Sequence, residues 1–255
     1  MSEPVNLLAV HGNGGGAIRF TRLVRRMPPG VALRTVTVPG FGGVPADPRL
    51  RTMDDYGAWL AREIGAMPHP RALLGHGIGG SWALAMLQRP VELDALILHA
   101  PVGAHLDTRR LPRAMRLPGA PELTRRVIAA RVVRPLLRRR VFDTNVPREL
   151  SDRFFEGYSD AEAFAQMFRI ITPEWFDGLR PIEVPTALLW GERDQVLGAG
   201  QIDELRRVAP GAIERVIAGW GHFPMIDRPT AYAKVVTDLL RALIDAPEPA
   251  TTPGQ

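Results

Sequence analysis

Short apolar segments alternate with longer amphipathic ones along most of the chain, and this alternation is the feature that most limits its possible folds. Apolar runs rich in Val, Ile, Leu and Ala predict buried strands, whereas the longer stretches have helical periodicity. Strands are predicted at residues 5–10, 32–38, 71–74, 95–99, 186–190 and 213–217. Helices are predicted at residues 17–27, 54–66, 79–89, 200–208 and 230–245. This order indicates an α/β fold with a mostly parallel sheet flanked by helices.

Residues 104–181 interrupt the alternation, because they contain no convincing strand. Helices punctuated by prolines are predicted there, at residues 121–140, 147–157, 160–171 and 173–179. Pro135 is expected to kink or divide the first of them. The predicted organisation is therefore a core formed by residues 1–103 and 182–246, a helical insertion at 104–181 and a disordered tail at 247–255.

The composition restricts the compartment and the partners. The 255 residues suffice for one large domain, or for a core with an insertion. No run reaches the ~18 consecutive apolar residues of a membrane span, and the start lacks the regions of a secretory signal. We therefore expect a cytoplasmic protein without membrane contact. The absence of cysteine excludes disulfides, thiolate metal sites and cysteine nucleophiles.

Arginine dominates the positive charge, because all of the 32 basic residues except Lys234 are arginine. Eleven of them lie between residues 105 and 145, inside the predicted insertion. We interpret the high arginine content as codon bias of a GC-rich genome. The arginine-rich segment is interpreted as a solvated face, and no nucleic acid is expected as a partner. A docking surface for an anionic substrate, a carrier protein or coenzyme A is the alternative.

The loops that follow the predicted strands carry the candidate chemistry. A His-Gly loop occupies residues 11–16, and a glycine-rich strand-to-helix elbow occupies residues 74–81. An acidic loop at 191–194 and a histidine loop at 219–222 follow the last two strands, and Pro-Gly-Phe-Gly follows the second strand at 39–42. In this order the motifs resemble those of the α/β-hydrolase family, although the family's usual leading hairpin is absent.

The resemblance implies an α/β-hydrolase fold in which residues 104–181 form a helical cap. By motif position it implies a general base, His222, oriented by the carboxylate of Asp194. Glu192 and Asp227 are weaker candidates for the acid position, and Asp227 is expected to cap or precede the last helix. An oxyanion hole would be formed by two backbone N–H groups, those of Asn13 and Ile78.

The position of the family's nucleophilic serine is occupied by Gly77. A tight elbow forces its central residue into a strained conformation that glycine adopts freely, so the geometry should survive without the reactive oxygen. Ser81 lies a full helical turn further on, directed away from the elbow. In a serine hydrolase of another fold, losing the nucleophile costs ~10⁶-fold in turnover, about 8 kcal/mol. Ordinary hydrolysis through an acyl-enzyme is therefore not expected.

A base facing an oxyanion hole suits proton abstraction next to a carbonyl, and the family is known to include non-hydrolytic lyases, dioxygenases and cyclases. The leading hypothesis is a lyase, isomerase or cyclase acting on a carbonyl-containing small molecule in specialised metabolite biosynthesis, with no cofactor and no metal. One alternative is an esterase-like hydrolase in which His222 activates water, or whose serine was replaced at Gly77 by engineering. The other is a ligand-binding protein with a degenerate site.

The predicted pocket wall combines residues of the edge loops with aromatic residues of the insertion: His11, His76, His99, Trp220, Phe223, Phe154, Tyr158 and Phe168. Of these, we interpret His11 and His76 as buried, hydrogen-bonded residues rather than acid–base groups. The aromatic content predicts an extended aromatic or polyketide-like substrate.

Residues 75–80 also match G-x-G-x-x-G, the fingerprint of a dinucleotide site. Such a site needs an acidic residue after the next strand, where this chain has His99-Ala100-Pro101. The nucleotide interpretation also leaves the other motif loops unexplained, so the hydrolase resemblance is preferred.

Overall fold

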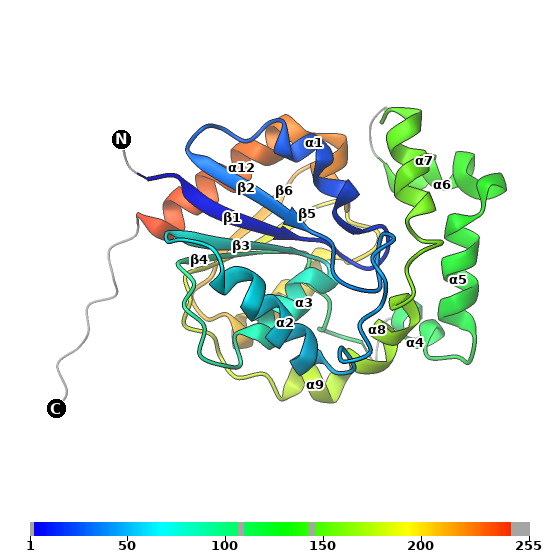
Figure 1. Ribbon diagram of the computed structural model, residues 1–255, viewed down its shortest axis with the longest axis horizontal. Helices are drawn as coiled ribbons and strands as arrows, with labels where there is room; N and C mark the ends of the chain where they lie inside the picture. Colours follow the sequence, from blue (N-terminus) through cyan, green and yellow to red (C-terminus); the bar gives the residue numbers. More distant parts are fainter. Residues whose placement is uncertain (1–2, 107–109, 143–145, 246–255) are drawn as a thin grey trace.

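Figure 1 shows a computed structural model of the chain, which describes residues 3–106, 110–142 and 146–245. The predicted disordered tail at 247–255 lies outside the described residues. No helix in the described ranges is long and apolar enough to cross a lipid bilayer.

Six parallel strands form a single sheet in the order β2-β1-β3-β4-β5-β6. Their bounds are Val5–Val10 (β1), Val31–Val36 (β2), Arg71–His76 (β3), Ala95–His99 (β4), Thr186–Gly191 (β5) and Ile213–Ile217 (β6). All six predicted strands are present. Because all run in one direction, the loops after them meet at one edge of the sheet. The register Val10↔Gly75 and His76↔His99 brings the His-Gly loop, the elbow and the end of β4 together.

Helices cover both faces of the sheet, as Figure 1 shows. The helices α2 (Met53–Gly65) and α3 (Ile78–Met86) lie on one face, and α1 (Thr21–Val24) and α12 (Pro229–Ile244) lie on the other. The remaining short helices of the core are η1 (Gly16–Phe20), η3 (Ala199–Gln201), α10 (Ile202–Val208) and α11 (Pro224–Asp227).

The helix predicted over residues 17–27 is divided into η1 and α1. The side chain of Thr21 donates a hydrogen bond to the carbonyl oxygen of Ile18 at 2.8 Å, where the 3-10 helix ends. A local side-chain bond of this kind competes with a continuous helical ladder.

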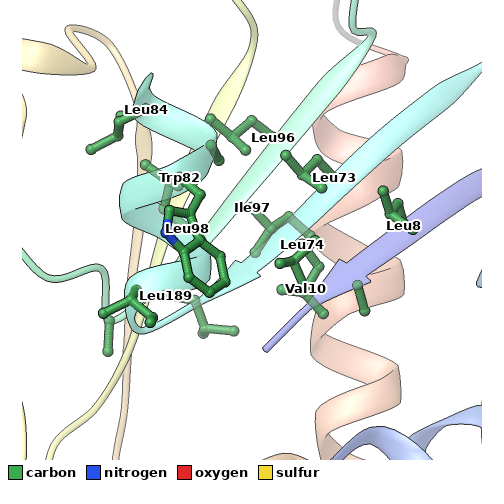
Figure 2. Packing of buried hydrophobic residues seen from close by; sticks show 14 of the residues in the cluster. Leu8, Val10, Leu73, Leu74, Trp82, Leu84, Leu96, Ile97, Leu98 and Leu189 are labelled. Carbon is green, nitrogen blue, oxygen red and sulfur yellow. The ribbon is translucent and has the colours of Figure 1, made fainter. Parts of the chain in front are cut away.

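The central strands are buried at every residue, as expected for a parallel sheet covered on both faces. Figure 2 shows aliphatic side chains of neighbouring strands, among them Leu74 of β3 and its register partner Ile97 of β4, with Trp82 of α3 nearby. Trp82 is fully buried and stacks on Tyr56 of α2, with ring centroids 5.2 Å apart. These contacts fix α3 on the sheet.

Glycines allow α3 to begin very close to the sheet. A Cβ on Gly79 would lie 2.5 Å from the carbonyl oxygen of Val10, and a Cβ on Gly75 would lie 2.7 Å from Cα of Gly80. Either contact is closer than real Cβ atoms allow. These glycines therefore serve strand–helix packing, and they place the first turn of α3 at the carboxyl edge of the sheet.

Between β4 and β5 the chain forms helices α4 (Arg110–Met115), α5 (Ala120–Ala129), α6 (Arg134–Val141), α7 (Arg148–Glu156), α8 (Phe164–Ile170) and α9 (Pro173–Asp177), with the 3-10 turn η2 (Arg131–Val133) before α6. The helices α4 to α8 lie at the end of the molecule toward which the strands point, whereas α9 lies below α2 in the view of Figure 1. We call residues 110–177 the helical segment.

The helical segment confirms the prediction made for Pro135. The helix expected over residues 121–140 ends at Ala129 and resumes at Arg134, because Pro135 has no N–H to continue the ladder and fits only in a first turn. The helix α4 was not predicted, because Pro112 lies within its sequence and Pro118 follows three residues after its end, a spacing typical of a loop. In the structure Pro112 is near the start of α4, where its missing N–H is not needed.

Candidate active site

The elbow between β3 and α3 has the backbone conformation of a strained turn. Gly77 has φ +57° and ψ −122°, a conformation that residues with a Cβ rarely adopt. Its N–H donates to the carbonyl oxygen of His99 at 2.9 Å, and its own carbonyl accepts from the N–H groups of Gly80 (3.0 Å) and Val102 (3.3 Å). These backbone hydrogen bonds hold the elbow without requiring a side chain at residue 77.

The space at the tip of the elbow is open. A Cβ built on Gly77 would have one neighbour within 4 Å among the described residues, the Cα of Gly12 at 3.4 Å. No hydroxyl of the described chain therefore replaces the absent serine oxygen. The hydroxyl of Ser81 donates to the carbonyl oxygen of Val102 at 2.6 Å, so the prediction that Ser81 is directed elsewhere is confirmed.

His222 and Asp194 form a buried pair. Nδ1 of His222 donates to Oδ2 of Asp194 at 2.7 Å, which leaves Nε2 of the neutral ring as a proton acceptor. This Nε2 makes no hydrogen bond to another described residue. The second oxygen, Oδ1 of Asp194, accepts from the N–H groups of Val196 (2.9 Å) and Leu197 (2.7 Å). The carboxylate is thus oriented from both sides.

Two opposing effects set the ionisation of Asp194. Burial acts to raise the pKa of its carboxyl, whereas the charge of His222 and the hydrogen bonds from His222 and Leu197 lower it, and the net pKa lies below its usual value. The carboxylate is therefore ionised near neutral pH and can stabilise an imidazolium at His222.

The other two candidates for the acid lie elsewhere. Oε2 of Glu192 accepts from the N–H of Gly219 at 3.1 Å, and the residue is exposed. Asp227 is the last residue of α11, two positions before α12 begins, which agrees with the prediction that it precedes the last helix. Asp194 is the carboxylate in contact with Nδ1 of His222.

The two predicted oxyanion-hole residues are Asn13 in the His-Gly loop and Ile78, which directly follows Gly77 in the elbow. Within the part of the chain that the structure describes, the backbone N–H groups of Asn13 and Ile78 donate to no acceptor, and both residues line the same cavity as Gly77 and His222. The side chain of Asn13 is fixed by a bond from Nδ2 to the carbonyl oxygen of Phe164 (3.3 Å). Two free amides beside a base can bind an oxygen that gains negative charge.

The cavity has a volume of about 290 Å³ and is lined mainly by apolar side chains. Its lining includes residues of the elbow, the His-Gly loop and His222, and residues of the helical segment form much of the remaining wall. Of the residues predicted for the pocket, four contribute to the lining: Phe154, Tyr158, Phe168 and Phe223. Such a lining suits an apolar ligand with few polar groups.

Four other residues predicted for the pocket do not belong to this lining: His11, His76, His99 and Trp220. His76 and His99 end β3 and β4, whereas His11 and Trp220 follow β1 and β6, and all four side chains are buried. His11 donates from Nδ1 to the carbonyl oxygen of Gly12 (2.7 Å) and accepts at Nε2 from the N–H of Val38 (3.0 Å). The interpretation of His11 as a buried, hydrogen-bonded residue is confirmed.

His99 and Trp220 pack against the same tyrosine. The hydroxyl of Tyr232 hydrogen-bonds Nδ1 of His99 at 2.9 Å, and the rings of Trp220 and Tyr232 are 5.7 Å apart. Burial lowers the pKa values of His11 and His99 to about 3, so both rings are neutral at physiological pH.

His76 supports the base from behind. Its Nε2–H donates to the backbone carbonyl oxygen of His222 at 3.0 Å, and the two rings are 4.5 Å apart. Burial, followed by the charges of His222, His99 and Arg19, lowers the pKa of His76 well below its usual value. A neutral His76 can therefore position the histidine loop without competing for protons.

Arg19 of η1 lines the cavity and was not predicted. It is 1% exposed, and its Nη1 donates to Nδ1 of His76 at 3.0 Å. The one sequence signal is its position between Ile18 and Phe20, directly after the His-Gly loop. In a chain with so many arginines this signal is easily overlooked.

No metal site is formed by three or more histidine or carboxylate side chains in the described ranges. A parallel sheet whose carboxyl edge unites a histidine–carboxylate pair, two free amides and a strand-to-helix elbow defines the α/β-hydrolase class. The sequence model described as "Alpha/beta hydrolase family" matches residues 7–235, and the chain belongs to this family.

Relatives with curated names are similar over nearly the whole chain. "Monoacylglycerol lipase abhd6-A" of Xenopus laevis is 24% identical over 262 residues, which cover 93% of this chain and 76% of the relative. "Pimeloyl-[acyl-carrier protein] methyl ester esterase" of Aromatoleum aromaticum is 24% identical over 257 residues, which cover 94% of this chain and 100% of the relative.

Solved structures share the fold. An esterase from Exiguobacterium antarcticum superposes with a TM-score of 0.74 at 19% identity, covering 94% of this chain and 93% of the esterase. At this identity the likeness concerns the architecture and not the substrate.

Proposed function

We propose that the protein is an enzyme that applies general-base catalysis to a carbonyl group of an apolar small molecule, without a covalent acyl-enzyme. One observation carries the proposal: His222, with Asp194 behind it, lines the same cavity as the free N–H groups of Asn13 and Ile78, while the elbow between them bears no hydroxyl. The base and the oxyanion hole are independent of the absent oxygen.

The first candidate reaction is ester hydrolysis by a water molecule that His222 activates. Nε2 takes a proton from water as the oxygen attacks the carbonyl carbon, and the same proton then passes to the leaving alkoxide. The amides of Asn13 and Ile78 bind the oxyanion of the tetrahedral intermediate. Open space at Gly77 leaves room for the water, and the names of the relatives, a lipase and an esterase, favour this reaction.

The second candidate is proton abstraction from the carbon next to the carbonyl. The resulting enolate oxygen would be held by the same two amides, and the enolate would lead to a lyase, isomerase or cyclase reaction. The absence of a nucleophile at Gly77 and the mainly apolar lining, which disfavours water, support this candidate.

We further propose that the insertion at 104–181 acts as a cap over the cavity. The side chains of Phe154, Tyr158 and Phe168 form part of its wall. Aromatic walls of this kind bind flat or extended apolar molecules, so an aromatic or polyketide-like substrate fits.

A panel of aromatic esters and ketones incubated in D₂O separates the candidates. Hydrolysis without an initial burst indicates water activation, and deuterium at the α-carbon indicates enolate formation. Either activity should fall by ~10²- to 10⁴-fold in His222→Ala, because a positioned base contributes about that factor. The control is His69→Ala, since His69 is half-exposed and bonded to Asp94 outside the cavity.

A turnover that is indifferent to His222→Ala contradicts the proposal. If ligands also bind equally well to this variant, the protein is a binding protein with a degenerate site.

A further inference from the structure

Arg19 is a buried cation without a counterion. Its side chain is 1% exposed, and within the described part of the chain no carboxylate lies within 4 Å of its guanidinium. Arg134, a buried arginine outside the lining of this cavity, is paired with Glu156 at 3.0 Å. A buried charge without a partner is costly, so the absence of an acidic group at Arg19 requires an explanation.

The contacts of Arg19 are with neutral groups. Nη1 donates to Nδ1 of His76 at 3.0 Å, and Nη2 donates to the carbonyl oxygen of Asn13 at 3.4 Å. Nε is buried and has no acceptor among the described residues. The guanidinium carbon lies 5.8 Å from the ring centroids of both Phe154 and Phe223. These contacts orient the guanidinium, but they do not neutralise it.

The side chain remains charged under ordinary conditions. Burial lowers the pKa of Arg19 to about 10, which is still three units above neutral pH. The nearby charge of Arg19 also acts to lower the pKa of Tyr158, although burial raises that pKa more strongly. The cavity therefore contains a fixed positive charge in a mainly apolar lining.

Arg19 lies beside the elbow. A Cβ on Gly12 would be 2.8 Å from Nη1 of Arg19, and a Cβ on Gly77 would be 3.4 Å from Cα of Gly12. A single backbone residue thus separates the guanidinium from the tip of the elbow. A ligand whose carbonyl reaches the amides of Asn13 and Ile78 would have its neighbouring atoms close to this cation.

We propose that Arg19 binds a carboxylate of the ligand, so that the substrate class is an apolar carbonyl compound bearing a carboxylate a few bonds from the reacting carbonyl. The planar guanidinium matches a carboxylate better than any other side chain does. The position of the carboxylate relative to the carbonyl rests on the proposed function, whereas anion binding at Arg19 does not. Binding of the anion would supply the counterion that the chain itself lacks.

The test is calorimetric binding of two probes of equal shape, 2-naphthoate and 2-naphthamide, at constant ionic strength. We expect wild type to bind 2-naphthoate about 10- to 100-fold more tightly, since a hydrogen bond to a charged group contributes about 1.5–3 kcal/mol. In Arg19→Met this preference should fall to about one. Arg19→Lys, which keeps a charge without the planar fork, should retain part of the preference.

Two controls separate this proposal from the proposed function. Arg25→Met removes the same charge from an exposed position and should keep the full preference. His222→Ala should also keep it while losing turnover, so a failure of catalysis leaves the anion site independently measurable.

Three results would overturn the proposal: equal affinity of wild type for both probes, no binding of 2-naphthoate, or an unchanged preference in Arg19→Met. If Arg19 serves only to hold His76, wild type will not discriminate between the probes. Circular dichroism verifies that each variant is folded. If Arg19→Met does not fold, the ratio of the wild-type affinities for 2-naphthoate and 2-naphthamide still tests the proposal.

Discussion

The elbow at Gly77 and the histidine loop at His222 line one cavity but differ in what holds them. Backbone hydrogen bonds to His99, Gly80 and Val102 hold the elbow, and none of them needs a side chain at residue 77. The histidine loop depends on side chains, because Asp194 orients the ring of His222 and His76 supports its backbone. The difference teaches that the shape of a catalytic site and its reactive group are separable, since one can be absent while the other is complete.

The largest effect is expected from restoring the hydroxyl at the elbow. Gly77→Ser should raise the hydrolysis of p-nitrophenyl esters by ~10³-fold or more, because a nucleophile beside a competent base and oxyanion hole recovers part of the ~10⁶-fold that its loss costs. Steady-state kinetics of purified variants provide the measurement. The gain should disappear in Gly77→Ser/His222→Ala.

A folded Gly77→Ser variant without any gain in ester hydrolysis would mean that His222 or the amides of Asn13 and Ile78 are not positioned for catalysis. The shape of the site would then not be complete without its reactive group.

The next effect concerns the neutral histidines behind the base. Burial lowers the pKa values of His11 and His99 to about 3 and that of His76 well below its usual value, whereas the unfolded residues titrate near 6.5. Below pH 6.5 the unfolded chain therefore binds more protons, and stability falls as the pH falls toward 3. Each ring contributes a slope of up to about 1.4 kcal/mol per pH unit, so the three together contribute about 4.

Urea unfolding between pH 7 and 4 measures this slope. His99→Gln keeps an acceptor for Tyr232 and should lower the slope by about a third, whereas His69→Ala, a change at a half-exposed residue, should leave it unaltered. An unchanged slope of the free energy of unfolding against pH in His99→Gln would show that His99 is not held neutral in the folded protein.

The smallest effect is expected from adding a methyl group without an oxygen. Gly77→Ala should lower the free energy of unfolding by about 1–2 kcal/mol, because a Cβ at φ +57° is strained although the space around it is open. Gly65→Ala, at the end of α2 where a Cβ meets nothing within 4 Å, serves as the control and should not destabilise. Gly77→Ala should gain no esterase activity. A stable Gly77→Ala variant would imply a relaxed elbow.

Much of the fold was predictable, because each buried strand is a short apolar run that ends at glycine or proline. The helical segment was less predictable. A proline in the sequence is compatible with a loop, a helix break or the first turn of a helix, and both Pro112 and Pro135 lie in the first turn of a helix, α4 and α6 respectively.

At the site, the order of motifs placed His222, Asp194 and Gly77 together at one edge. The order of motifs does not determine side-chain direction, so His99 was expected in the pocket and lies bonded to Tyr232 instead. Arg19 was missed because arginine is ordinarily exposed, and its partner His76 is 57 residues away in the sequence.

The most direct test of the central claim is labelling with a fluorophosphonate, followed by mass spectrometry of the intact protein and its peptides. Wild type is expected to stay unmodified, and Gly77→Ser is expected to acquire one label on residue 77. This label should be lost when His222 is also replaced by alanine. Labelling of wild type, or a folded Gly77→Ser variant that resists the reagent, would contradict the claim that only the hydroxyl is absent from this site.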